Sequence, residues 1–107
     1  MTKRDDRTAI PAQDCASMED VRREIDRLDE ELVTRLAERF SYVDRAWQIK
    51  TGTAEGAYVP WRVQQVIDKV RALAADKGLP PELVEAMWRQ MIGWFIQYEE
   101  ERMRNRD

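Results

Sequence analysis

The hydrophobic positions in the first half of the chain follow the period of an α-helix. Apolar residues recur, mostly at intervals of three and four, at Val21, Ile25, Leu28, Leu32, Leu36, Val43 and Trp47. This spacing is typical of a helix with one buried face. Ser17 is followed three residues later by Asp20, a capping-box pattern, and no glycine or proline interrupts the run up to Lys50. The pattern predicts a helix of roughly 33 residues, about 50 Å long at 1.5 Å per residue.

Two shorter helices are predicted in the second half. Gly52 and Gly56 indicate a loop over residues 51–59, and the proline at position 60 suits the first turn of a second helix. Gly78 ends that helix, and a third helix runs from about Pro81 to Arg102. The apolar faces are Val63, Val66, Ile67, Val70, Leu73 and Ala74 in the second helix, and Val84, Met87, Trp88, Met91, Ile92, Phe95 and Tyr98 in the third.

The predicted fold is therefore all-α, with three helices per chain, one of them long. Residues 17–104 form the helical domain, and residues 1–16, which are polar and aperiodic, form a flexible leader. Two short helices cannot cover a helix of about 50 Å along its whole length. Because an apolar face in water costs about 25 cal/mol per Å², we expect an intertwined homodimer whose long helices pack together. The alternative is a monomer with a projecting helix end.

Composition excludes several classes of function. The chain of 107 residues has no histidine, one cysteine (Cys15) and a net charge of −3. It therefore lacks the commonest acid–base catalyst, a metal-ligand cluster, an internal disulfide and the basic surface of a nucleic-acid binder. There is no apolar run of about 20 residues, no secretory signal and no glycine-rich phosphate loop. We expect a cytoplasmic protein that binds no nucleic acid, membrane, metal or cofactor.

Charged residues on the apolar faces are the candidate functional groups. Arg39 and Lys50 are eleven residues apart, about three helical turns, and both fall within the apolar face. An unpaired buried cation costs several kcal/mol, so each requires either a protein carboxylate or an anionic ligand. Arg62 lies at the edge of the second helix's apolar face, and Glu99 is aligned with the apolar face of the third. Arg22 lies about 100° around the wheel from Arg39, so it could reach a site of another subunit.

Two interpretations of these charges remain open. Asp26, Asp29 or Glu99 could neutralise the cations in an internal salt-bridge network. Alternatively, the cations could bind a small dicarboxylate, because guanidinium groups hold carboxylates bidentately. No nucleophile–base pair is evident, so an enzyme of this kind would act by positioning and electrostatics. A unimolecular rearrangement or elimination is such a reaction.

The segment from Val21 to Lys50 resembles the first helix of the all-α chorismate mutase family. The family pattern L-R-x-x-I-D-x-I-D-x-x-L followed by a lysine recurs here in spacing, with an internal A-x-R. P-x-R-V at 60–63 and W-F-I-x-Y-E at 94–99 follow in order, so the resemblance covers about residues 18–102. It implies an intertwined all-helical homodimer that uses no cofactor and binds the two carboxylates and the ether oxygen of chorismate.

The resemblance also implies a role for each charged residue. Arg22 corresponds to the arginine donated by the partner chain, and Arg39 to an arginine that binds a substrate carboxylate. Lys50 corresponds to the lysine that contacts the ether oxygen and a carboxylate as the C–O bond breaks. Arg62 corresponds to the arginine that binds the other carboxylate. Glu99 occupies a position that holds Gln or Glu in the family, and a Glu there must be protonated to donate to the ether oxygen.

Val59 and Val63 depart from the typical mutase, which has polar residues at these two positions to hold the ring hydroxyl. In this respect the chain is similar to the isochorismate pyruvate-lyase branch, which releases salicylate and pyruvate. The first expectation is chorismate mutase, which rearranges chorismate to prephenate. The alternative is isochorismate pyruvate-lyase, and the further alternatives are a 4-amino-4-deoxychorismate mutase and a non-catalytic helical interaction module.

Overall fold

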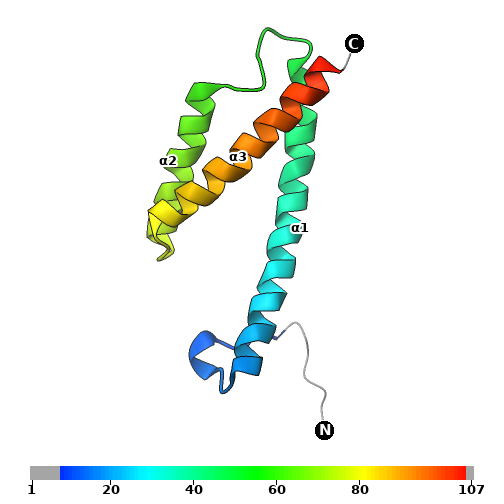
Figure 1. The fold of residues 1–107 in the computed structure, drawn as a ribbon. Helices are drawn as coiled ribbons and strands as arrows, with labels where there is room; N and C mark the ends of the chain where they lie inside the picture. The colour runs from blue at the N-terminus through cyan, green and yellow to red at the C-terminus, as the bar shows by residue number, and fades with distance from the viewer. Residues whose placement is uncertain (1–7, 106–107) are drawn as a thin grey trace. The chain divides into compact units, whose positions relative to one another are not determined.

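The computed structural model describes residues 8–105. Over this range the chain forms a short 3-10 helix (Ala12–Asp14) and three α-helices: α1 (Met18–Lys50), α2 (Pro60–Asp76) and α3 (Pro81–Arg104) (Figure 1). The prediction of an all-α chain with one long helix is confirmed, and the helix ends lie within about two residues of those expected. Residues 1–7 of the expected leader lie outside the described range, so its flexibility stays a prediction.

The chain divides after Phe40 into two compact units. The first unit contains most of α1, and its start is capped as the sequence predicts. The Ser17 hydroxyl accepts a hydrogen bond from the Asp20 backbone N–H at 3.2 Å. The Asp20 carboxylate in turn accepts one from the Ala16 N–H at 3.0 Å. A capping box of this kind satisfies N–H groups that have no partner within the helix.

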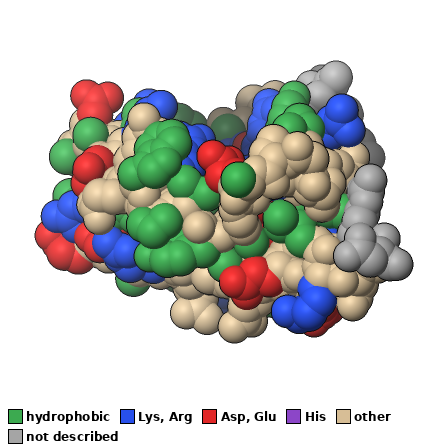
Figure 2. Space-filling view, turned by 90° about the horizontal axis from the view of Figure 1, so that it is seen from above, with side chains coloured by type: hydrophobic (Ala, Val, Ile, Leu, Met, Phe, Trp, Pro, Cys, Tyr) green, Lys and Arg blue, Asp and Glu red, His purple; other side chains and the backbone are tan. Residues whose placement is uncertain are grey.

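The apolar face of α1 is exposed in the single chain. Ile25, Leu28, Leu32 and Leu36 are all exposed, and 60% of the surface of Leu32 remains accessible. Exposed hydrophobic side chains also gather between charged ones on the face drawn in Figure 2. Within this single chain, α1 has no buried residue. The face that the sequence pattern indicates as buried is therefore left uncovered by the described part of the chain.

The second unit is built on the packing of α2 against α3. Ile67, only 1% exposed, is buried together with Ala74 from α2 and Val84 from α3. Glu85 of α3 adds a polar connection, because its carboxylate accepts hydrogen bonds from Arg71 of α2 and from Arg89 of α3, each at 2.7 Å. These two hydrogen bonds, with the one from Arg89 first, lower the pKa of Glu85. A small apolar core and one charged bridge thus join the two helices.

A glycine turn connects α2 to α3. Gly78 has φ = 80°, a left-handed conformation that costs a residue with a side chain about 1–2 kcal/mol. The Leu79 N–H donates to the Ala74 carbonyl at 2.8 Å, and the Gly78 N–H donates to the Ala75 carbonyl at 3.4 Å. This is the Schellman arrangement, which satisfies the last carbonyls of a helix. It reverses the chain so that α3 can return along α2 (Figure 1).

Candidate active site

The centre of the candidate site is an ion pair between Lys50 and Glu99. Lys50 is the last residue of α1, and its Nζ lies 3.1 Å from Oε2 of Glu99 on α3. The two side chains are only 17% and 9% exposed. Lys50 Nζ also donates to the carbonyl oxygen of Ala57 at 3.3 Å. For Lys50, the negative group that the sequence requires is a carboxylate of the same chain, as the internal salt-bridge interpretation expects.

Local structure explains why a lysine ends α1 at this point. The carboxyl end of a helix carries a partial negative charge that stabilises a cation. The final carbonyls are satisfied by a tight turn, in which Gly52 N–H donates to Ile49 O at 3.1 Å and Thr53 N–H donates to Lys50 O at 2.9 Å. The chain then continues to Ala57, which is buried and presents its carbonyl to Lys50. The loop therefore supplies the third member of the site.

A second polar cluster lies next to this ion pair. One carboxylate oxygen of Asp44, on α1, accepts a hydrogen bond from the Tyr98 hydroxyl at 2.7 Å and another from the Trp47 indole N–H at 2.7 Å. The bond from Tyr98, followed by that from Trp47, lowers the pKa of Asp44. The same bond to Asp44, together with burial, raises the pKa of Tyr98. We call Asp44, Trp47 and Tyr98 the Asp44 cluster.

The apolar periodicity predicts Trp47 and Tyr98 only as members of apolar faces, and Asp44 is not among the predicted site residues. Two signals were present: Asp44 precedes Trp47 by three residues, the distance of one helical turn, and Tyr98 immediately precedes Glu99. A buried tyrosine hydroxyl or tryptophan N–H usually has a hydrogen-bond partner. The carboxylate of Asp44 fills that role for both.

Three further predicted site residues share the start of α2. Val59 is the residue before the helix, and its carbonyl accepts hydrogen bonds from the N–H groups of Arg62 and Val63 at 3.0 and 3.1 Å. Both valines are half-buried. The guanidinium of Arg62 is exposed and donates to the Gln65 side chain at 2.7 Å. The structure thus brings these three residues to one helical turn, and Arg62 is held there by its own helix.

Arg22 and Arg39 lie on the part of α1 that belongs to the first unit. Arg22 is exposed, and Arg39 is half-buried and engaged in contacts of its own. That these two arginines act together with Lys50 stays a prediction.

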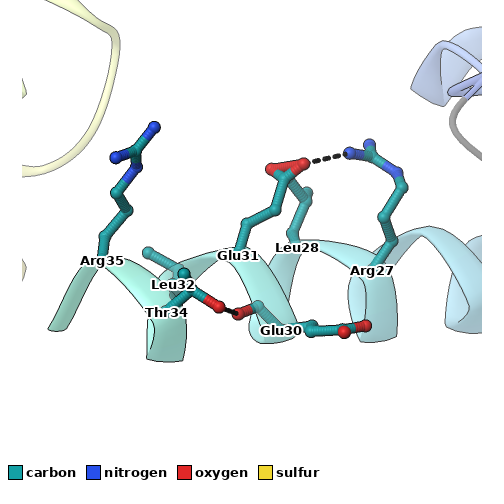
Figure 3. Close-up of a pocket in the computed structure, with 7 residues that line it drawn as sticks. All are labelled: Arg27, Leu28, Glu30, Glu31, Leu32, Thr34 and Arg35. Carbon is teal, nitrogen blue, oxygen red and sulfur yellow. Dashed lines mark hydrogen bonds and ion pairs between the residues drawn. The ribbon is translucent and has the colours of Figure 1, made fainter. Parts of the chain in front are cut away.

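A hollow along α1 contains none of the predicted site residues. It is lined by Arg27, Leu28, Glu30, Glu31, Leu32, Thr34 and Arg35 (Figure 3). All seven come from a single helix, and Arg27 bridges to Glu31 at 3.2 Å on one side of it. A hollow formed by one helix is open on its other side, and its apolar floor is the exposed face of α1 described above.

No group of three histidine, cysteine, aspartate or glutamate side chains within residues 8–105 is arranged to hold a metal ion. None of the helices in the same range has an apolar stretch that could cross a membrane.

Comparison with known proteins agrees with the resemblance in the sequence. Residues 21–100 match the sequence model of the family described as chorismate mutase type II. A protein of Pseudomonas aeruginosa named isochorismate pyruvate lyase is 33% identical over 84 residues, which is 78% of this chain and 82% of that protein. The matched region contains every predicted site residue, from Arg22 to Glu99. The chain therefore belongs to the type II chorismate mutase family and is an enzyme, an isomerase or a lyase.

Proposed function

We propose that the chain is an isochorismate pyruvate-lyase that cleaves isochorismate into salicylate and pyruvate. The observation that carries this proposal is the pair of valines, Val59 and Val63, at the turn that holds Arg62. Neither side chain can form a hydrogen bond to a ring hydroxyl, whereas a typical mutase has polar residues at these two positions that hold that hydroxyl. The similarity to the lyase of Pseudomonas aeruginosa supports the same assignment.

The residues of the site suit a reaction in which a C–O bond breaks without a nucleophile. Negative charge accumulates on the ether oxygen as this bond lengthens, and a fixed cation stabilises that charge most in the transition state. Lys50, which is largely shielded from water, is the proposed cation. Arg62 and Arg39 are proposed to bind the two carboxylates of the substrate. As the C–O bond breaks, a hydrogen on the neighbouring ring carbon moves to the methylene carbon of the enolpyruvyl group, which gives the methyl group of pyruvate and the aromatic ring of salicylate. The two products together contain every atom of isochorismate, so the reaction needs no water, oxidant or other co-reactant.

Glu99 has to change its role when a substrate binds. In the structure its carboxylate accepts a hydrogen bond from Lys50, whereas donation to a substrate oxygen requires a proton. Glutamine carries N–H donors at every pH. We expect Glu99→Gln to retain activity, because the amide supplies a donor at the same position. Loss of activity in this variant would show that the position needs a carboxylate and not a hydrogen-bond donor.

We propose further that two copies of the chain form the active enzyme. The exposed apolar face of α1 supplies the surface, and the same face of a second copy matches its length and character. In such a dimer Arg22 would contribute to the site of the partner subunit. The open hollow beside Leu28 and Leu32 would then be closed by the second chain.

Rearrangement of chorismate to prephenate is the second candidate, and the match to the chorismate mutase family over residues 21–100 favours it. The deciding experiment compares turnover of chorismate and isochorismate by the same preparation, following prephenate and salicylate. Faster release of salicylate supports the lyase. Faster formation of prephenate overturns it in favour of the mutase.

Matched variants make this experiment specific to the site. Lys50→Ala should strongly lower the faster activity, whereas Lys69→Ala removes an exposed lysine of α2 and should leave it unchanged. Removing one donor to a developing negative charge typically costs about 10²- to 10³-fold in kcat. Val63→Glu restores a polar residue after Arg62 and should shift the preference toward chorismate. If Val63→Glu leaves the ratio of the two activities unchanged, the valines do not determine the substrate.

A further inference from the structure

Two side-chain bridges join the end of α1 to α3 within the second unit, and they are close together on both helices. Lys50 bonds to Glu99 at 3.1 Å, and Asp44 bonds to the Tyr98 hydroxyl at 2.7 Å. On α3 the two residues involved, Tyr98 as donor and Glu99 as acceptor, are consecutive. On α1 they are six residues apart, less than two helical turns. The two bridges therefore join the same stretches of the two helices.

The tyrosine of the second bridge is held firmly on its own helix. Its ring stacks on Trp94 with centroids 5.8 Å apart and planes inclined by 11°. The guanidinium carbon of Arg102 lies 4.9 Å from the centre of the same ring. Aromatic stacking and a cation over a ring each add roughly 0.5–1.5 kcal/mol beyond burial. The ring of Tyr98 thus has neighbours one turn before it and one turn after it on α3.

The carboxylate that receives the tyrosine is held on the other helix. Trp47, three residues after Asp44 on α1, donates its indole N–H to the same oxygen that accepts the Tyr98 hydroxyl. The side chain of Asp44 therefore has a fixed orientation from within its own helix. Trp47 in turn precedes Lys50 by three residues, or about one turn.

We infer that Asp44 and Tyr98 are positioning residues that set the distance between Lys50 of α1 and Glu99 of α3 in the active site. This inference rests on the proposed function, because it assigns the ion pair to substrate binding and turnover. Neither residue touches the reacting atoms in this scheme. They act by fixing the approach of the two helices, and a misplacement of about 1 Å at a reacting centre can lower the rate about 100-fold.

The first test needs no substrate. Tyr98→Phe retains the ring and its stacking but removes the hydroxyl that reaches Asp44. Brief acetylation followed by mass spectrometry then reports the reactivity of Lys50, with Lys69 and Lys77, both exposed, as internal references. We expect Lys50 to become severalfold more reactive in Tyr98→Phe while both references stay constant. Unchanged reactivity of Lys50 would overturn the inference, whichever substrate the enzyme uses.

A conservative replacement separates the hydrogen bond from packing. Asp44→Asn retains an oxygen that can accept from Tyr98 and Trp47, whereas Asp44→Leu removes both acceptors and keeps the same branched shape. Lys50 should be protected in Asp44→Asn and reactive in Asp44→Leu. Equal reactivity in the two variants would contradict a role for the hydrogen bond. Tyr42→Phe, at an exposed tyrosine of α1, serves as the control and should match the wild type.

The second test uses turnover and a double-mutant cycle. Tyr98→Phe should lower kcat about 10- to 100-fold with a smaller change in KM. In a Lys50→Ala background the same change should have no further effect, because the residue that Tyr98 positions is already absent. Multiplicative losses would indicate a merely structural role and would overturn the inference. If the wild type turns over neither isochorismate nor chorismate, the proposed function fails, and the acetylation result alone decides the positioning role.

Discussion

Truncation of Leu32 to alanine tests whether the exposed face of α1 is the contact between two copies of the chain. Leu32 lies in the middle of that face and is 60% exposed in the single chain. Leu→Ala removes three methyl or methylene groups, each of which contributes about 0.8 kcal/mol when it is buried. At 60% exposure, the burial available to these groups in a dimer is about 1.4 kcal/mol per copy.

A two-fold interface counts this contribution twice, because the same residue is present on both sides. Leu32→Ala should therefore weaken the dimer by about 3 kcal/mol, which corresponds to a roughly 100-fold higher dissociation constant. Sedimentation equilibrium over a series of protein concentrations measures that constant directly. Thermal unfolding gives a second readout, because the Tm of a dimer rises with protein concentration.

The matched control is Arg23→Ala, which removes an exposed side chain from α1 roughly 180° around the helix from Leu32 and outside the hollow. This variant should dissociate like the wild type. Equal dissociation constants for Leu32→Ala and the wild type would refute the assignment of the interface to this face. A wild-type chain that stays monomeric throughout the concentration series would refute the dimer itself.

Three further predictions concern stability. In chemical denaturation, Ile67→Ala should lower the free energy of unfolding by about 2–5 kcal/mol, and Ile67→Val should lower it by only about 0.5–1.5 kcal/mol. Equal losses in the two variants would mean that α2 and α3 do not close over Ile67. Gly78→Ala should lower the free energy of unfolding by about 1 kcal/mol, because an added Cβ meets no neighbour and only the positive φ is strained. Gly56→Ala, where an added Cβ also meets no neighbour, is the control. Equal losses of stability in the two variants would contradict the strain at Gly78. The pKa of Asp44 is lowered in the folded chain. Its charged form therefore stabilises the fold at any pH above the unfolded-state pKa of about 3.9. This stabilisation disappears as the pH falls through the lower pKa of the folded state. Melts of the wild type and Asp44→Asn should therefore differ by a constant amount from neutral pH to about 5 and converge in stronger acid, and a difference that is independent of pH down to acid unfolding would be inconsistent with the lowered pKa.

Local signals were sufficient to predict the helices. Ser17 with Asp20, the glycine at position 78 and the proline at position 60 act within a few residues of where they stand. Their effects follow from hydrogen-bonding and backbone geometry alone. The period of the apolar residues added the direction of each face, and the structure places the three α-helices where these signals indicated. The 3-10 helix at Ala12–Asp14 was not predicted, because it lies in the polar stretch read as a leader.

The pairing of charges could not be predicted in the same way. Lys50 and Glu99 are 49 residues apart, and Asp44 and Tyr98 are 54 residues apart. Which residues meet across two helices depends on the rotation and offset of those helices, which the period of one helix does not specify. The sequence therefore left open whether Lys50 faces a carboxylate of the protein or of a ligand. What covers the α1 face is likewise not given by the period of one helix, and the second copy of the chain stays a proposal.

The ion pair between Lys50 and Glu99 has a consequence for the release of product. A carboxylate attached to the same fold is present at the ammonium group at a high effective concentration, far above that of a dissolved metabolite. Under the proposed function, a substrate group that leaves Lys50 would be replaced at once by an anion that cannot diffuse away. Glu99 would then lower the affinity for substrate and product alike, and would shorten the residence time of the product. In this enzyme a single glutamate would weaken binding and make turnover faster.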